Sequence, residues 1–213
     1  MTTPDAHHHD DAHAESDALD RAIERLFAHR EGTLHFDEHF IPTPFITYPE
    51  SGRLVMPIPE AAFFAHEHIF FVPEEAHDAL QLLLSLERAE ESALTDRWMA
   101  HHGEPEQVRW AECYIDAAKR QPWVFDGDAL MLANPLAGDE PWIVRTLNED
   151  DQHVARVASS IVGKEATEAR VVGVDDRGAH VRARFGVLRA HFPERVANGN
   201  DAVDAFRALG ARG

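Results

Sequence analysis

The chain has 213 residues, of which 44% are hydrophobic, and its formal net charge is −18. This length accommodates one large domain or two small ones, with an ordinary buried core. The large negative charge argues against binding to a nucleic-acid backbone, which requires clustered Lys and Arg, and equally against an anionic membrane surface.

The apolar and cysteine content favours a cytoplasmic protein. No run approaches the ~18 consecutive apolar residues that a membrane-spanning helix needs. The first residues are polar and acidic, so we expect neither a signal peptide nor a transit peptide. The single cysteine, Cys113, excludes an intrachain disulfide framework and is typical of a reducing compartment.

The N-terminal region combines a polar segment with a first helix. Residues 1–16 contain His7, His8, His9 and His13 among Asp and Ala and lack apolar periodicity, which predicts a disordered His/Asp-rich tail. Apolar residues at helical spacing predict a helix over residues 16–29. We expect Gly32 to end this helix in a left-handed conformation.

From residue 33 the pattern changes to short strands separated by Pro and Gly turns. The run over residues 79–87 has Leu at every second position, which favours a strand, although a helix can also hold it. Residues 108–116 alternate in the same way. Several short strands at turn-punctuated intervals predict a β-barrel.

A second unit begins at Asn134. Apolar residues predict a helix from about residue 141 to 161, and the polar run over residues 148–151 predicts a kink or break in it. The segment over residues 169–185 predicts a hairpin around a turn at residues 175–178. A further strand and a final helix close the chain.

The order of these elements, with three short motifs, resembles a known family. The motifs are Pro-Leu-Ala-x-x-Glu-Pro at residues 135–141, Leu-Asn-x-Asp at 147–150 and Gly-Val-Asp-x-x-Gly at 173–178. The chain resembles haem-utilisation proteins, in which a pyridoxamine-phosphate-oxidase-like split barrel precedes a small α+β domain. The resemblance implies an α+β fold, with a split β-barrel (FMN-binding split-barrel-like) over residues 17–133 and a small α+β domain over 134–213. It also implies a homodimer with a flavin or haem site at the dimer interface.

The chain departs from this family at its cofactor residues. The family signature His-Met-Asn-x-Asp-His is replaced by Thr-Leu-Asn-Glu-Asp-Asp at residues 146–151. Flavin-binding relatives carry a basic segment where residues 72–78 of this chain are acidic, so we do not expect tight FMN binding. The family's C-terminal histidine ligand is also missing.

Four histidines are the candidate haem ligands, because imidazole commonly ligates haem iron: His66, His68, His153 and His191. We place His153 first, because it lies nearest the signature position. His66 and His68 are two apart and would share one face of a strand. The sequence contains no phosphate-binding glycine loop, nucleophile elbow or paired zinc cysteines, so no catalytic residue or metal site is assigned.

Three functions follow from this reading. The first is a haem-binding or haem-handling protein that is not catalytic. The second is a cofactor-free member of the same fold with a regulatory role or a protein partner. The third is a flavin- or haem-dependent oxidoreductase.

Overall fold

The computed structural model describes residues 6–106 and 109–209. The chain forms two compact units: unit 1 comprises residues 1–45, 53–89 and 108–132, and unit 2 comprises residues 46–52, 90–107 and 133–213. The sequence predicts one boundary, between residues 133 and 134, and the structure has a crossing between Leu132 and Ala133. Segments 46–52 and 90–107 also belong to unit 2, although the predicted boundaries leave both in the barrel domain.

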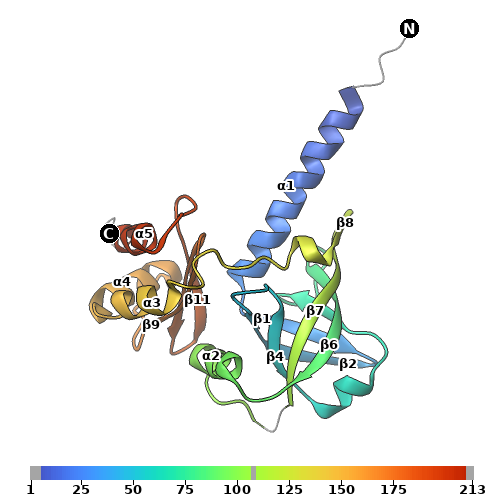
Figure 1. Ribbon diagram of the computed structural model, residues 1–213, viewed down its shortest axis with the longest axis horizontal. Helices are drawn as coiled ribbons and strands as arrows, with labels where there is room; N and C mark the ends of the chain where they lie inside the picture. The colour runs from blue at the N-terminus through green and yellow to red at the C-terminus, as the bar shows by residue number, and fades with distance from the viewer. Residues whose placement is uncertain (1–5, 107–108, 210–213) are drawn as a thin grey trace. The chain divides into compact units, whose positions relative to one another are not determined.

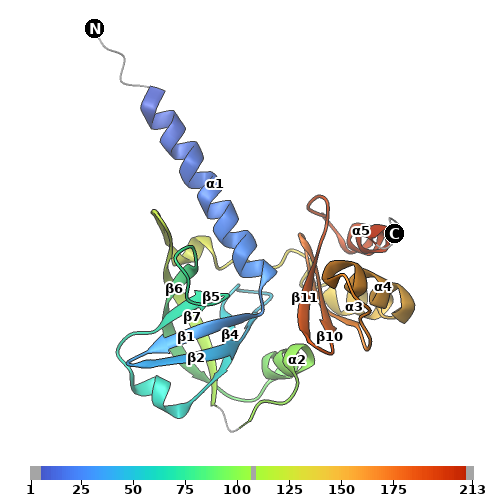
Figure 2. The ribbon, with the colours of Figure 1, turned by 180° about the vertical axis from the view of Figure 1, so that it is seen from behind.

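The fold is α+β, and unit 1 contains a curled antiparallel sheet that forms a half-barrel (Figures 1 and 2). Its strands follow the order β2-β1-β5-β6-β7-β4, and β8 pairs with β7. The elements of this unit after its first helix are β1 (Glu31–Phe36), β2 (His39–Pro44), β4 (Leu54–Ile58), η1 (Glu60–Phe64), β5 (Ile69–Val72), β6 (Leu80–Ala89), β7 (Arg109–Arg120), β8 (Trp123–Asp126) and η2 (Gly127–Ala129).

The leucine-rich run forms strand β6, so the preference for a strand over a helix is confirmed. Leu80, Leu82 and Leu84 are buried in the unit 1 core, whereas the residues between them are more exposed. β6 pairs along its length with β7, and the register shifts between Leu83 and Leu84. Alternation places every second leucine on the concave, apolar side of the half-barrel.

Helix α1 (Ala6–Ala28) is longer than the sequence predicts. The structure begins it at Ala6, so residues 6–16 are helical where a disordered tail is predicted; residues 1–5 lie outside the described residues. Ala18, Ala22 and Leu26 pack one face of the helix on the core of unit 1. The sequence of these N-terminal turns has no apolar periodicity to detect, and the high helix propensity of alanine extends the helix.

Gly32 lies inside β1 and does not end the first helix. A Cβ atom at this position would overlap the ring of Phe70 and the carbonyl oxygen of Phe71. Glycine is therefore required here by the close approach of an aromatic ring, and its conformational freedom is not used.

The hairpin of β1 and β2 forms one edge of the half-barrel. His35 and His39 belong to opposite strands of this hairpin, so their spacing of four is not a helical one. Pro42 pairs with Thr33 and Pro44 with Glu31. Because proline cannot donate a ladder hydrogen bond, these two positions weaken the free edge of β2 as a site for strand addition.

Unit 2 is built on a three-stranded antiparallel sheet in the order β11-β10-β9. Helices α3, α4 and α5 pack against it (Figure 1). The elements of this unit are β3 (Ile46–Thr47), α2 (Ala93–His102), α3 (Glu140–Leu147), α4 (Asp151–Val162), β9 (Arg170–Asp175), β10 (Gly178–Ala183), β11 (Gly186–His191) and α5 (Gly199–Leu209). The predicted break at residues 148–151 is confirmed as the connection between α3 and α4.

Hydrogen bonds from two arginine side chains attach helix α2 to unit 2. Arg97 of α2 donates two hydrogen bonds to the Glu140 carboxylate of α3, at 2.8 and 2.6 Å. Arg182 of β10 donates to the carbonyl oxygen of Ala100 at 3.1 Å, near the C-terminal end of the helix. These contacts hold the inserted segment 90–107 on the sheet of unit 2. Among the described residues, none of the helices combines the length and apolar character that a bilayer crossing demands.

Candidate functional site

The connection between α3 and α4 contains the residues that align with the family signature. Its Asn148 side chain makes two hydrogen bonds with the backbone of Val171 in β9. The Nδ2 group donates to the Val171 carbonyl oxygen at 2.8 Å, and Oδ1 accepts from the Val171 N–H at 2.9 Å. The amide therefore satisfies the backbone at the free edge of β9, as a neighbouring strand would, and fixes the connection to the sheet.

The second shared signature residue, Asp150, is the N-cap of α4. Its Oδ1 atom accepts a hydrogen bond from the His153 N–H at 2.9 Å. A carboxylate at this position satisfies a free backbone donor and interacts favourably with the helix dipole. Asn148 and Asp150 thus both have structural roles that explain a Leu-Asn-x-Asp sequence without a cofactor.

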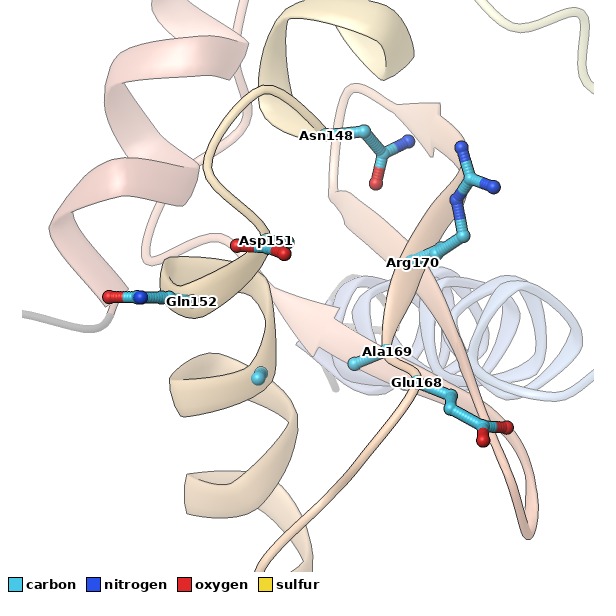
Figure 3. Close-up of a pocket in the computed structure, with 7 residues that line it drawn as sticks. Asn148, Asp151, Gln152, Glu168, Ala169 and Arg170 are labelled. Carbon is cyan, nitrogen blue, oxygen red and sulfur yellow. The ribbon is translucent and has the colours of Figure 1, made fainter.

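Two open pockets lie beside this connection, and its residues are divided between them. The His153 pocket has a volume of about 420 Å³ and is lined by Thr146, Leu147, Glu149, Asp150, His153 and Arg207. The Arg170 pocket has a volume of about 640 Å³ and is lined by Asn148, Asp151, Gln152, Ala155, Glu168, Ala169 and Arg170 (Figure 3). Each pocket contains both carboxylates and cationic or imidazole groups, so each is suited to a polar ligand.

His153, the first predicted ligand, is half-buried and has contacts at both ring nitrogens. Nε2 lies 3.3 Å from the Phe206 carbonyl oxygen, and Nδ1 lies 3.4 Å from Nη2 of Arg156. A neutral ring that donates through Nε2–H and accepts at Nδ1 satisfies both contacts. Iron ligation would therefore require His153 to give up a protein contact.

The histidines predicted in unit 1 differ in their surroundings. His68 is only 7% exposed, and its Nε2 lies 2.6 Å from the carbonyl oxygen of Ala62. His66 is exposed, and no hydrogen bond or ion pair to its ring is present within residues 6–106 and 109–209. Both precede β5, which begins at Ile69, so the expected common face of a strand is not formed.

The fourth candidate, His191, is exposed and ends β11, where it pairs with Gly178. Of the four predicted histidines, His66 and His68 belong to unit 1, and His153 and His191 belong to unit 2. In the described part of the chain, no group of three or more His, Cys, Asp or Glu side chains is placed to hold a metal ion.

Sequence reasoning missed a buried network of charged side chains in unit 2. Arg189 donates to both carboxylate oxygens of Asp175, at 2.7 and 2.6 Å, and its Nη1 lies 3.3 Å from Nδ1 of His180. Asp175 also accepts a hydrogen bond from the Arg177 N–H at 2.9 Å, as expected of a turn-forming aspartate. The pairing with Arg189, fourteen residues later, has no local sequence signal.

The Arg97–Glu140 pair extends this network. The Oε1 atom of Glu140 accepts a hydrogen bond from the Val174 N–H at 2.8 Å, and the Glu140 side chain is 4% exposed. Nδ1 of His101 lies 2.9 Å from the Arg97 carbonyl oxygen. A Cβ atom at Gly173 would lie 3.0 Å from Nε2 of His101, so the glycine of the Gly-Val-Asp motif allows β9 and α2 to approach each other closely.

Other reactive side chains of the sequence have structural surroundings. Oδ1 of Asp126 accepts a hydrogen bond from the Asp128 N–H at 2.9 Å and caps the short helix η2. Tyr114 donates to Asp128, and this hydrogen bond raises the pKa of the tyrosine hydroxyl. Burial raises the pKa of the Cys113 thiol, so this cysteine is a neutral, small hydrophobic residue of the unit 1 core.

Comparison with known proteins identifies a shared fold. No protein-family model matches the sequence. No curated protein matches it either. The protein Atu2129 from Agrobacterium tumefaciens str. C58, described as of unknown function, matches with a TM-score of 0.70 and 14% identity over 98% of this chain and 97% of its own.

A heme binding protein from Mycobacterium smegmatis matches with a TM-score of 0.43 and 14% identity, over 92% of this chain and 96% of its own. At this TM-score the likeness supports no statement about the present chain. The likeness to Atu2129 shows that the fold of this chain is shared by another protein over nearly its whole length.

Proposed function

We propose that this chain binds and handles haem without catalysis, through the imidazole of His66. The supporting observation is the state of that ring, which is exposed and has no hydrogen-bond or ion-pair partner among the described residues. A neutral imidazole with a free lone pair is a common ligand of haem iron.

An exposed aromatic side chain lies two residues before His66. Phe64 is 74% exposed, which is unusual for a large apolar side chain. A porphyrin has an extended apolar face, and packing it on this ring would remove apolar surface from water. Phe64 at the end of η1 thus offers one apolar contact, and His66 in the connection to β5 offers one iron ligand.

The other histidines are less suited to this role. His68 and His153 are hydrogen-bonded to the protein, as described above. His77 is exposed, but no exposed large apolar side chain lies next to it in the sequence, as Phe64 does for His66. A ligand at the exposed His66 leaves the iron open to solvent, which favours transfer of haem over enclosed redox chemistry.

The test is a haemin titration followed by the Soret absorbance. The wild-type protein is expected to give a ligated Soret band that His66→Ala loses. Phe64→Ala should bind haemin roughly tenfold more weakly, because an apolar contact is removed. His77→Ala is the matched control, since it removes another exposed imidazole, and it should bind as the wild type does.

Two results would overturn this proposal. An identical Soret band and affinity in His66→Ala would remove His66 as the ligand. The lack of any band in the wild type would remove haem and favour the cofactor-free regulatory or protein-interaction function. A flavin spectrum in the purified protein would instead favour the oxidoreductase. We do not expect this spectrum, because the exposed Glu74 and Glu75 should repel the phosphate of FMN.

We also propose that the protein is a homodimer through unit 1. Large apolar side chains are exposed on its sheet, with Leu83 39% and Val124 63% exposed. A two-fold interface between identical chains is the commonest way to cover such surface. Light scattering at micromolar concentration should give twice the mass of the chain, and a monomer would contradict the proposal.

A further inference from the structure

We propose that Arg88 and Arg109 of unit 1 bind the propionate groups of haem. This inference rests on the haem binding proposed above, and it concerns the part of the ligand that the imidazole of His66 does not contact. Haem carries two carboxylates at one edge of the porphyrin. The chain has a net charge of −18, so a local positive charge would offset the general repulsion of this anionic edge.

The two arginines share one carboxylate, that of Glu60 at the start of η1. Arg88, near the end of β6, donates through Nη1 to Oε2 of Glu60 at 3.0 Å and through Nη2 to Oε1. Nε of Arg109, the first residue of β7, lies 3.2 Å from the same Oε2. Hydrogen bonding to Arg88, assisted by the charges of both arginines, lowers the pKa of the Glu60 carboxyl. One negative charge thus faces two positive charges, and the cluster keeps a positive charge.

The guanidinium of Arg88 is held in place and remains accessible. Its Cζ lies 4.2 Å from the centre of the Phe63 ring, a cation–π contact that fixes its position before a ligand arrives. The side chain is 50% exposed. A guanidinium has five N–H donors, of which Arg88 uses two on Glu60, so it has the capacity to bind a second carboxylate.

The cluster lies on the same short helix as the apolar contact for the porphyrin. Glu60 begins η1 and Phe64 ends it, and a rise of about 2.0 Å per residue separates them by about 8 Å along its axis. On the other side of the proposed iron ligand, Glu67 directly follows His66 and is exposed, so its carboxylate would repel a propionate. We therefore expect the propionate edge of a porphyrin packed on Phe64 to point toward the two arginines.

Arg53 offers a matched control in the same unit. Its Nη1 lies 3.2 Å from the Glu112 carboxylate and 3.8 Å from that of Glu87, and its Cζ lies 5.6 Å from the centre of the Tyr114 ring. Like Arg88, it combines carboxylate contacts with an aromatic ring. Its cluster has two carboxylates for one guanidinium, however, and keeps a negative charge that would not attract a propionate.

The test compares haemin with haemin dimethyl ester, in which both propionates are uncharged and the iron is unchanged. Both are titrated into the full chain in the same detergent-containing buffer and followed by the Soret absorbance. The wild type should bind haemin more tightly than the ester, and added salt should weaken only haemin binding, because it screens the ion pairs. The position of the ligated Soret band should be the same with both, since His66 ligates the iron in each.

The variants Arg88→Gln and Arg109→Gln should each weaken haemin binding about fivefold, as expected for the loss of an exposed ion pair. They should leave the affinity for the ester and the Soret position unchanged, whereas a merely structural role of the arginines would weaken both ligands. Glu60→Gln should strengthen haemin binding by a similar factor, because it frees both guanidinium groups. Arg53→Gln should match the wild type with both ligands, and all four variants should keep the wild-type circular dichroism.

Two outcomes would overturn the assignment of the arginines while haem binding stands. One is equal affinity of the wild type for haemin and the ester. The other is haemin binding that Arg88→Gln and Arg109→Gln both leave unchanged. If neither ligand gives a Soret band with the wild type, haem binding itself fails, and the assignment fails with it.

Discussion

The two units of this protein bury polar side chains to different extents. In unit 1 the buried polar or charged residues are Arg30, Thr43 and His68, whereas the core around them is apolar. Unit 2 buries a larger set, which is Thr95, His101, Glu140, Asp175, Arg177, His180 and Arg189. Both units are therefore stabilised by removal of apolar surface from water, and unit 2 in addition contains buried charges that depend on their partners.

This difference determines how each unit responds to the loss of a side chain. An apolar core tolerates exchange of similar side chains and loses stability in proportion to the volume removed. A buried ion pair adds little net stability, but it is costly when only one partner is removed, because the remaining charge is left uncompensated. In the Arg97–Glu140 pair the carboxylate is buried and the guanidinium is 25% exposed, and the pair also holds the inserted helix α2 in unit 2.

The largest expected effect is the loss of a core ring in unit 1. Phe70 is fully buried, and its ring meets the Phe45 ring edge-on with centroids 5.2 Å apart. Phe70→Ala should lower the free energy of unfolding by about 3–5 kcal/mol, the usual cost of a large cavity. Urea unfolding measures it, and labelling of the buried Cys113 thiol should become faster, because this residue reports opening of the same core.

The matched control is Leu83→Ala, which removes a side chain that is 39% exposed on β6. Its effect should be well below that of Phe70→Ala, since less apolar area is returned to water. A cost for Phe70→Ala no greater than that of the control would mean that unit 1 is not held by its apolar core.

A slightly smaller effect is expected from removing one charge of the network in unit 2. Glu140→Gln keeps the shape of the side chain but leaves the Arg97 guanidinium without a counter-charge. We expect a loss of about 3 kcal/mol in the free energy of unfolding, the lower end of the cost of breaking a buried pair. Urea unfolding measures the loss, and the rate of Cys113 labelling in unit 1 should stay close to the wild-type rate.

Two further variants sharpen this prediction. Glu60→Gln breaks the exposed pair with Arg88 in unit 1 and should cost far less, because water screens both charges. The double variant Arg97→Met with Glu140→Leu should recover part of the loss, since an apolar pair leaves no buried charge. The recovery cannot be complete, because the Val174 N–H also loses its acceptor. A single variant as stable as the wild type would contradict the role of the pair.

The fold of unit 1 could be predicted from the sequence to the extent that it follows from alternation. The leucines of β6 alternate with the period of a strand, and the structure buries every second one in the core of unit 1, as the alternation predicts. Two features could not be read in this way. The sequence over residues 6–16 has no apolar periodicity, and Gly32 is required by a ring that comes from β5, far along the chain.

The site of unit 2 was less accessible to sequence reasoning. The break between α3 and α4 was predictable, because four polar residues interrupt an apolar face. The structural roles of the residues in this break were not predictable. Asn148, for example, hydrogen-bonds to Val171, and no local sequence pattern indicates that contact. Likewise, Asp175 was interpreted as a turn former, but its pairing with Arg189 depends on the register of β9, β10 and β11.

The smallest expected effect concerns a carboxylate of unit 2 that is only partly compensated. Asp176 is half-buried beside Asp175, and burial, followed by the charge of Asp175, raises the pKa of its carboxyl above the ordinary value of 3.8. Arg177 and Arg195, each 3.9 Å from its carboxylate, oppose this shift without cancelling it. A raised pKa means that the folded state binds this proton more strongly than the unfolded state does.

The sign of the pH effect follows from this difference. The free energy of unfolding should fall as the pH rises from the ordinary pKa through the raised one, and the loss should persist at neutral pH. Asp176→Asn removes the ionisation, so this variant should be slightly more stable than the wild type at neutral pH and should show no gain below the ordinary pKa. Urea unfolding at both pH values measures the change, with the exposed Asp204→Asn on α5 as a control that should show none. A variant that is less stable at neutral pH would mean that the Arg177 and Arg195 pairs outweigh burial, and that unit 2 compensates even its half-buried charges.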